Sequence, residues 1–86
     1  MQVLITPSAK RQLESLPQKV RSRIDKHILA LGENPRPPGS IALEGVSGLC
    51  RIRVGDYRVI YKIEDKDLVV LVVRIGHRRE VYRPRS

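Results

Sequence analysis

Arginines in the C-terminal half of the chain are spaced so that they could bind one polyanion together. Residues 49–63 alternate apolar and polar side chains on both sides of a Gly-Asp pair at 55–56, which predicts two antiparallel strands joined by a tight turn. If that turn has two residues, Arg53 lies directly opposite Arg58, and Arg51 lies one pair further along the same face. Like charges opposite each other destabilise a sheet. The phosphates of RNA or DNA would explain why the sequence places them there.

The net charge of the whole chain supports a nucleic-acid partner. Seventeen Lys and Arg against nine Asp and Glu give a net charge of +8, and the sequence pI is near 10.4. A pI above about 9 is typical of nucleic-acid-binding domains. The positive charge is concentrated at the C-terminal end, where Glu80 is the one acidic residue among Arg74, Arg78, Arg79, Arg83 and Arg85. A solvated basic tail that only aids solubility is the alternative.

Length and composition exclude several classes of protein. Eighty-six residues are enough for one domain, residues 1–86, with a small core. The apolar residues fall in short periodic segments, so we expect no membrane-spanning helix. The start of the chain lacks the basic and long apolar regions of a signal peptide, and Cys50 has no second cysteine to pair with. We therefore expect a cytoplasmic protein without metal or other cofactor.

The N-terminal half is predicted to form one strand and two helices. Residues 2–5 are a strand candidate, and the first helix starts at a cap provided by either Thr6 or Ser8 and ends at Pro17. A second helix follows and stops at Gly32. Its apolar stripe consists of Val20, Ile24, Ile28 and Leu31. Two antiparallel helices joined at a proline are expected to cover one face of a sheet.

The C-terminal half is predicted to form that sheet. Residues 33–48 are rich in Pro and Gly, which indicates a long connection without regular structure. Strands follow at 49–54 and 57–63, and after a turn at 64–67 the apolar run 68–75 is typical of a strand buried on both faces. The order β-α-α-β-β-β predicts a small α+β domain with a mainly antiparallel sheet and both helices on one face.

Strand alternation assigns the side chains to two faces of this sheet. The face predicted to be covered by the helices holds Ile52, Val54, Tyr57, Val59, Tyr61 and Ile63. The opposite face holds Arg51, Arg53, Arg58, Ile60 and Lys62, together with Val69, Leu71 and Val73 of the last strand. Apolar residues within a basic face indicate a groove that another chain could cover. The Pro-rich connection could fold over the same residues instead.

Two motifs resemble those of a known toxin family. The run GLCRIRVGDYRVIY at 48–61, followed by VRIGHRREVY at 73–82, closely resembles the RelE branch of the RelE/ParE toxin superfamily. The order of the predicted elements extends the resemblance over nearly the whole chain. It implies a microbial-ribonuclease-like fold and the toxin of a type II toxin–antitoxin pair. It also implies an endoribonuclease that cleaves messenger RNA in the A site of the 70S ribosome, and a cognate RelB-like antitoxin that wraps the toxin in a heteromeric complex.

The resemblance assigns catalytic roles to four arginines and a tyrosine. The two basic residues at alternate positions before the turn correspond to Arg51 and Arg53, and the arginine of the Gly-x-Tyr-Arg stretch corresponds to Arg58. Arg78 and Tyr82 correspond to the basic residue and the tyrosine of the second motif. Cleavage by a ribose 2′-hydroxyl needs charge stabilisation at phosphorus and proton transfer, which suits arginines and a tyrosine.

The general base is left open by one departure from the family pattern. The best-known members carry lysines where this chain has Arg51 and Arg53, and an arginine with a pKa above about 12 is a poor base. His77 is the natural substitute because histidine titrates near neutrality, although an exposed polar role is the simpler expectation. We also expect His77, Arg79 and Arg83 to contact RNA. Two alternatives remain, namely a ParE-like gyrase inhibitor and a homologue that binds nucleic acid with little or no catalysis.

Overall fold

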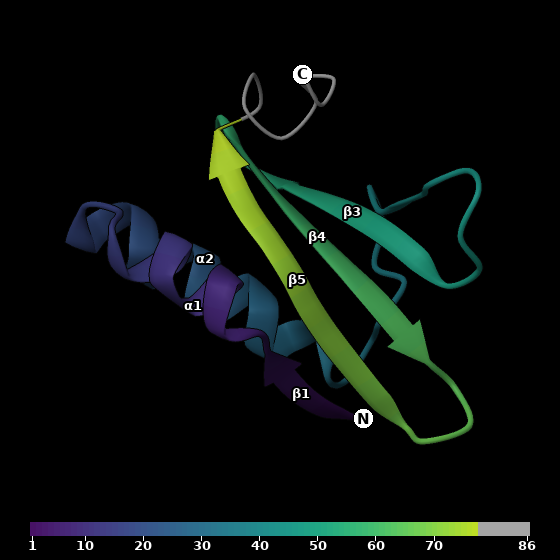
Figure 1. Ribbon diagram of the computed structural model, residues 1–86. Helices are drawn as coiled ribbons and strands as arrows, with labels where there is room; N and C mark the ends of the chain where they lie inside the picture. The colour runs from purple at the N-terminus through teal and green to yellow at the C-terminus, as the bar shows by residue number, and fades with distance from the viewer. Residues whose placement is uncertain (78–86) are drawn as a thin grey trace.

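The computed structural model describes residues 1–77 and contains two layers, one of helices and one of strands (Figure 1). The elements in chain order are β1 (Gln2–Ile5), α1 (Pro7–Glu14), α2 (Gln18–Leu31), β2 (Ile41–Ala42), β3 (Leu49–Val54), β4 (Tyr57–Glu64) and β5 (Val69–His77). Within the described residues the strands form one sheet in the order β1-β5-β4-β3-β2. Strand β1 runs parallel to β5, and the other neighbours are antiparallel. The predicted α+β class is confirmed.

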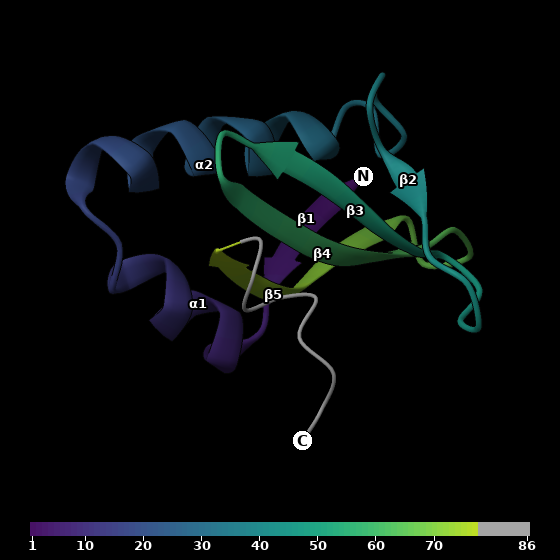
Figure 2. The same ribbon diagram turned by 90° about the horizontal axis from the view of Figure 1, so that it is seen from above.

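Both helices pack on the same side of the sheet (Figures 1 and 2). The hydroxyl oxygen of Thr6 accepts a hydrogen bond from the Ala9 N–H at 3.1 Å, and Pro7 occupies the first helical position. Thr6, not Ser8, is therefore the N-cap of α1. Helix α2 starts directly after Pro17, as predicted. The buried helix residues are Ala9, Leu13, Ile24, Ile28 and Leu31.

The core lies between these helices and the inner face of the sheet. Its fully buried strand residues include Val59, Tyr61, Val70 and Val72. Tyr57 is half-buried and packs against the same cluster. Alternation along β3 and β4 was therefore predicted correctly for the covered face. Cys50 is also buried as a small filler, and burial raises the pKa of its thiol, which lowers the fraction of thiolate.

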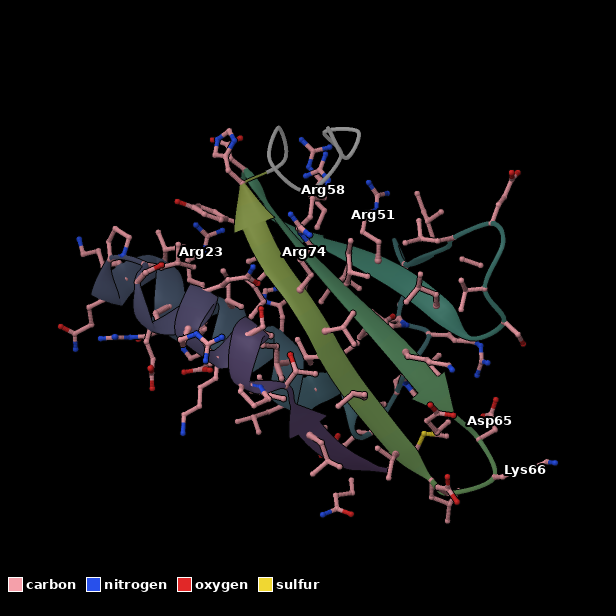
Figure 3. All side chains as sticks on the ribbon, viewed as in Figure 1. Arg23, Arg51, Arg58, Asp65, Lys66 and Arg74 are labelled. Atoms are coloured by element: carbon pink, nitrogen blue, oxygen red, sulfur yellow. The ribbon has the colours of Figure 1, made fainter. Side chains whose placement is uncertain are left out.

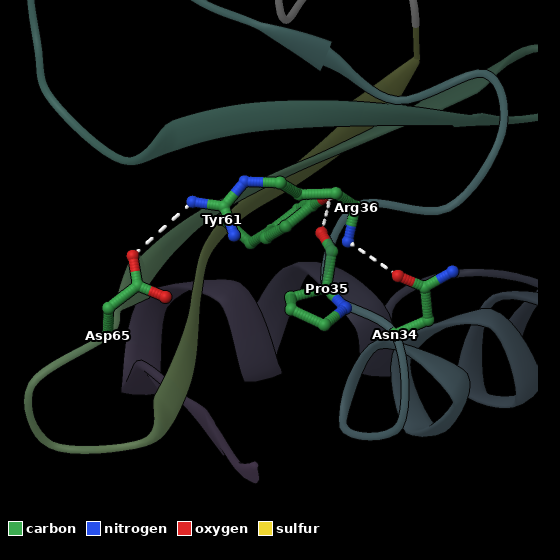
Figure 4. Close-up of polar contacts among 5 residues, drawn as sticks. All are labelled: Asn34, Pro35, Arg36, Tyr61 and Asp65. Carbon is green, nitrogen blue, oxygen red and sulfur yellow. Dashed lines mark hydrogen bonds and ion pairs between the residues drawn. The ribbon is translucent and has the colours of Figure 1, made fainter.

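The tyrosine at the centre of β4 fixes the Pro-rich connection to the core. The Tyr61 hydroxyl donates a hydrogen bond to the Pro35 carbonyl at 2.7 Å (Figure 4). The next residue, Arg36, forms an ion pair with Asp65 of the β4–β5 turn at 3.3 Å. Because Tyr61 points to the helix side, these contacts hold the start of the connection beside the core. The sequence left open that the Pro-rich connection folds over the basic face, but Pro35 lies on the opposite side, beside Tyr61.

The prediction that residues 33–48 have no regular structure was wrong at one place. Ile41 and Ala42 form β2, which pairs with Arg51 and Cys50 at the edge of β3. Both β2 side chains are exposed, so no hydrophobic alternation identifies the strand. Only the backbone pairing at the edge of β3 defines it.

The interpretation of residues 68–75 as a strand buried on both faces was also wrong. Ile60 pairs with Arg74, but the next residue, Tyr61, pairs with Val72, so Val73 is an extra residue in a β-bulge. Ile75 is consequently buried and Arg74 is exposed. Outside the core face, Val69, Leu71 and Val73 are only half-buried, because the helices cover only the other face.

The Tyr61 hydroxyl is expected to contribute measurably to folding stability. Replacing Tyr61→Phe removes the hydrogen bond and leaves the Pro35 carbonyl without that donor, which is expected to cost about 1–2 kcal/mol in the free energy of unfolding. Urea denaturation measures this difference. The half-buried Tyr57 provides the matched control, because Tyr57→Phe is expected to change stability by less than about 0.5 kcal/mol. Equal effects of the two substitutions would contradict the assignment.

The same tyrosine predicts a pH dependence of stability in the alkaline range. Burial raises the pKa of Tyr61 to about 12 from the ordinary value of 10.0. Above pH 10 the unfolded chain therefore loses this proton while the folded chain retains it, so the stability falls between pH 10 and 12. Each unit of difference corresponds to about 1.4 kcal/mol. In denaturation at stepped pH, Tyr61→Phe is expected to show a shallower fall than the parent, and identical slopes would refute this.

Candidate nucleic-acid interface

Four arginines from three neighbouring strands gather on the face that the helices leave uncovered. Arg53 of β3 lies directly opposite Arg58 of β4, as the sequence predicted, and Arg51 lies opposite Ile60. Ile60 is in turn paired with Arg74 of β5. Figure 3 shows Arg51, Arg58 and Arg74 on the side of the sheet away from α1 and α2. We call Arg51, Arg53, Arg58 and Arg74 the arginine cluster.

Sequence reasoning missed Arg74 as a member of this cluster. Strand alternation through Val69, Leu71 and Val73 places residue 74 on the core face. The bulge at Val73 reverses that assignment and brings Arg74 beside Ile60. No residue type near position 73 indicates the bulge. The signal that could have found Arg74 is its charge, which disagrees with the core position that alternation gives it. An arginine is rarely placed in a hydrophobic core.

The members of the cluster differ in how firmly the fold holds them. Arg58 is 8% exposed, although it carries a permanent charge, and it lies opposite Gly76, which has no side chain to occupy the space. Arg51 is half-buried, whereas Arg53 and Arg74 are exposed. The Nε of Arg53 donates a weak hydrogen bond to the Gly55 carbonyl at 3.4 Å. A fixed cation at Arg58 surrounded by accessible cations is suited to holding a phosphate group.

The tight turn beside the cluster sets this register. The turn residue Gly55 has a φ of 61°, as the first central residue of a type II′ hairpin turn does. This conformation favours glycine and joins Val54 directly to its partner Tyr57. The opposed arginines at 53 and 58 follow from this two-residue turn.

The same open face becomes apolar away from the cluster. A row across four strands consists of Leu4, Leu71, Lys62 and Leu49, each paired with the next. Leu4 is 42% exposed, and Leu71 and Leu49 are half-buried. The ammonium group of Lys62 lies 3.5 Å from the Glu64 carboxylate, which partly neutralises its charge. The open face therefore combines a basic region and an apolar region.

His77 lies on the other face of the sheet. It pairs with Tyr57, and the two rings meet edge to face with centroids 5.7 Å apart. Because Tyr57 packs toward the core, this contact places His77 on the helix side, beside a hollow of about 440 Å³ that Gln12 and Ser15 also line. Arg74 of the arginine cluster lines the same hollow, whereas Arg51, Arg53 and Arg58 do not. The role of His77 as an RNA contact or as a base stays a prediction.

The remaining predicted site residues, Arg78, Arg79, Tyr82 and Arg83, lie outside the described residues 1–77. Within residues 1–77, no group of three His, Cys, Asp or Glu side chains could hold a metal ion. In the same part of the chain, none of the helices is long and apolar enough to cross a membrane. The described part of the site is thus a set of permanent cations on a sheet.

Comparisons with known proteins relate this small α+β domain to toxins of type II toxin–antitoxin systems. The family model described as the ParE toxin of type II toxin–antitoxin systems matches residues 3–82. Toxin RelG of Mycobacterium tuberculosis is 31% identical over 84 residues, which cover 94% of each chain. Toxin RelE of the same organism is 35% identical over 82 residues, covering 94% of this chain and 84% of the relative.

A solved structure agrees in both fold and sequence. A chain of the archaeal RelE-RelB complex from Pyrococcus horikoshii superposes with a TM-score of 0.80 at 34% identity, covering 90% of this chain and 93% of that one. The chain belongs to the ParE toxin family of type II toxin–antitoxin systems and, within the RelE/ParE superfamily, to its RelE branch.

The opposed arginines are expected to cost stability and to add affinity for nucleic acid. Arg53→Gln removes the repulsion with Arg58 and is expected to raise the free energy of unfolding by about 0.2–1 kcal/mol. The same substitution is expected to weaken RNA binding. Because one phosphate contact is lost, the slope of the log binding constant against log salt concentration is expected to become shallower by about one. Urea denaturation and RNA binding at stepped salt concentrations measure the two effects.

A matched control is available at the far end of the sheet. Lys66 lies in the turn between β4 and β5, away from the cluster (Figure 3). Lys66→Gln removes one positive charge as well, but it is expected to leave both stability and the salt dependence unchanged. If the two substitutions weaken RNA binding equally, net charge and not the cluster determines the affinity.

Proposed function

We propose that this toxin is a ribosome-dependent endoribonuclease that cleaves messenger RNA in the A site of the 70S ribosome and thereby inhibits translation in the cytoplasm. The observation that carries the proposal is the arginine cluster, which three strands assemble on the uncovered face of the sheet. The cluster offers the permanent positive charge that a phosphate in a transition state requires. The similarity to RelE and RelG toxins supports the same activity.

The chemistry follows from the types of residue in the site. In the proposed reaction, the ribose 2′-hydroxyl gives up its proton and its oxygen attacks the adjacent phosphorus, while negative charge develops on the phosphate oxygens. The bond to the leaving 5′-oxygen breaks and that oxygen takes up a proton, so the reaction neither gains nor loses protons. Arg58, which the fold holds nearly buried, would stabilise that charge together with Arg78. Arg51 and Arg53 would bind neighbouring phosphates and align the messenger. Tyr82 would stack on a base or exchange a proton with the reacting groups.

The arginines at 51 and 53 act, in this proposal, through charge and not as bases. An arginine stays protonated at neutral pH, so neither residue can take the proton of the 2′-hydroxyl efficiently. Their contribution is instead to favour the ionised 2′-oxygen and the charged phosphate electrostatically. The ribosome supplies the alignment of the messenger that the small open site does not provide. Dependence on the ribosome is therefore an expected property of such a site.

An antitoxin is the proposed regulatory partner. The archaeal relative of known structure forms a complex with RelB. The row of Leu4, Leu71 and Leu49 leaves apolar surface on the open face of this chain, where a partner could bury it. We infer that a RelB-like antitoxin with acidic or amphipathic segments covers this row and the adjoining arginines, forming a heteromeric complex.

A ParE-like gyrase inhibitor is the second candidate, because the matching family model is the one described for ParE toxins. Such a toxin would not need arginines arranged for RNA. A supercoiling assay with purified gyrase separates the two functions. Unchanged supercoiling at toxin concentrations that arrest translation would exclude the gyrase activity.

The cleavage assay compares naked messenger with messenger bound in the ribosomal A site. Cleavage is expected only on ribosomes. Arg78→Ala is expected to lower its rate by about a hundredfold or more, because one charge-stabilising group is lost. Arg85→Ala is the matched control, since it removes an arginine of the same tail to which no catalytic role is assigned. Tyr82→Phe retains the ring, so a normal rate in this variant would favour stacking over proton exchange.

Two outcomes would contradict the proposal. Cleavage of naked RNA at the same rate would remove the dependence on the ribosome. The absence of cleavage in both settings, with folded protein that still binds ribosomes, would favour the homologue that binds nucleic acid without catalysis. Thermal melting of each variant separates a lost function from a lost fold.

A further inference from the structure

Strand β3 has an edge that β2 covers only in part. The Leu43 N–H donates to the Leu49 carbonyl at 2.8 Å on the β2 side, whereas the Gly48 carbonyl accepts from Ile63 of β4, also at 2.8 Å. Alternation along β3 therefore directs the backbone polar groups of residues 49, 51 and 53 toward the β2 side. Strand β2 begins at Ile41, opposite Arg51. Among residues 1–77, no β2 residue lies opposite Arg53, so its N–H and carbonyl face an open edge.

A groove follows this open edge. It is a hollow of about 430 Å³ between β3, the C-terminal half of α2 and the Pro-rich connection. Its apolar surface comes from Ala30, Leu31, Ile52, Pro37 and Pro38, and the ionisable residues among those that line it in the described chain are His27, Arg51 and Arg53. The groove therefore combines apolar walls, positive charge and an unpaired strand edge.

Hydrogen bonds within the chain hold both walls of the groove. On one side, the Pro35 carbonyl is bonded to the buried Tyr61, and the Ser40 N–H donates to the Pro37 carbonyl at 3.0 Å. On the other side, Nδ1 of His27 lies 2.9 Å from the Arg23 carbonyl. A carbonyl only accepts hydrogen bonds, so Nδ1 carries a proton in this contact. A preformed groove lowers the entropic cost of binding.

We propose that this groove binds an extended acidic segment of a partner chain, which adds to the sheet as a strand beside Arg53 in line with β2. Backbone hydrogen bonds to the edge would supply register, an apolar side chain would enter the hollow, and acidic side chains would pair with Arg51 and Arg53. The inference rests on the proposed function in identifying the partner as the antitoxin. It specifies how that partner would neutralise two of the proposed catalytic arginines.

Other occupants fit the groove less well. A second copy of this chain would bring Arg51 and Arg53 of both copies together at the shared edge, and each copy carries a net charge of +8. RNA would match the arginines but would leave the apolar walls and the backbone groups of the edge without partners. An acidic peptide strand satisfies all three features of the groove.

The test uses a blocked seven-residue synthetic peptide in which Glu alternates with Val and Leu, titrated into the full-length toxin and followed by calorimetry and amide NMR shifts. We expect saturable binding with shifts centred on Arg53 and the facing residues of the connection. A peptide with Lys in place of Glu is expected to bind at least about tenfold more weakly. A peptide N-methylated at alternate residues, which cannot pair along one edge, is expected to lose a similar factor.

Substitutions on the exposed surface of α2 test the location. Ala30 lines the groove and is exposed, so Ala30→Glu places a bulky negative charge there and is expected to weaken binding about tenfold or more. Ala30→Gln separates bulk from charge and is expected to have a smaller effect. Leu29→Glu is the matched control, because Leu29 is 70% exposed and does not line the groove. It is expected to leave the affinity within about twofold.

Undiminished binding to the Ala30→Glu variant, or equal binding of the N-methylated peptide, would overturn the inference. A toxin dimer in sedimentation that the peptide dissociates would instead identify a second copy as the occupant. An RNA oligonucleotide that shifts the same amides more strongly than the peptide does would identify RNA as the occupant. Peptide binding is independent of cleavage. A toxin that binds the peptide but fails to cut messenger would refute the proposed function alone, and a toxin that cuts messenger but ignores the peptide would refute the groove alone.

Discussion

The two helices cover only one face of the sheet, and the rest of the structure depends on this asymmetry. On the covered face, Val59, Tyr61 and Val72 are fully buried in the hydrophobic core that stabilises so small a chain. The opposite face has no second layer of helices within the described residues, so it can carry charge. Strand alternation then places core and cluster residues next to each other in sequence but on opposite sides of the sheet.

This asymmetry explains how repulsion between arginines is tolerated. The stability of the domain comes from the covered face, so a loss at the Arg53–Arg58 pair does not disturb the packing beneath it. Arg58 is an intermediate case, because it is nearly buried while remaining charged. Stored repulsion of this kind is released when a polyanion or an acidic segment binds. The free protein is then less stable than its complexes, which fits a toxin that is normally held by a partner.

The sequence predicted the parts of the fold that depend on local patterns. The Gly-Asp turn at 55–56 fixes the register of its hairpin, so the opposition of Arg53 and Arg58 followed directly. The cap at Thr6 and the stop at Gly32 are local in the same sense. What could not be predicted depends on pairing between distant segments. Strand β2 exists only through its contact with β3, and the position of Arg74 depends on how β5 meets β4. For the candidate site, three of the five residues assigned catalytic roles lie among the described residues.

The bulge in β5 divides that strand into two segments with opposite phase. Before Val73, even-numbered residues such as Val70 and Val72 face the core, and after it the odd-numbered Ile75 does. Because of this one additional residue, the first segment of β5 buries Val70 and Val72 in the core, and the second segment places Arg74 on the open face. Residues 74–77 of β5 follow this second phase. Removing the extra residue would exchange the two faces for residues 74–77, so the length of β5 is under tighter constraint than the identity of its apolar side chains.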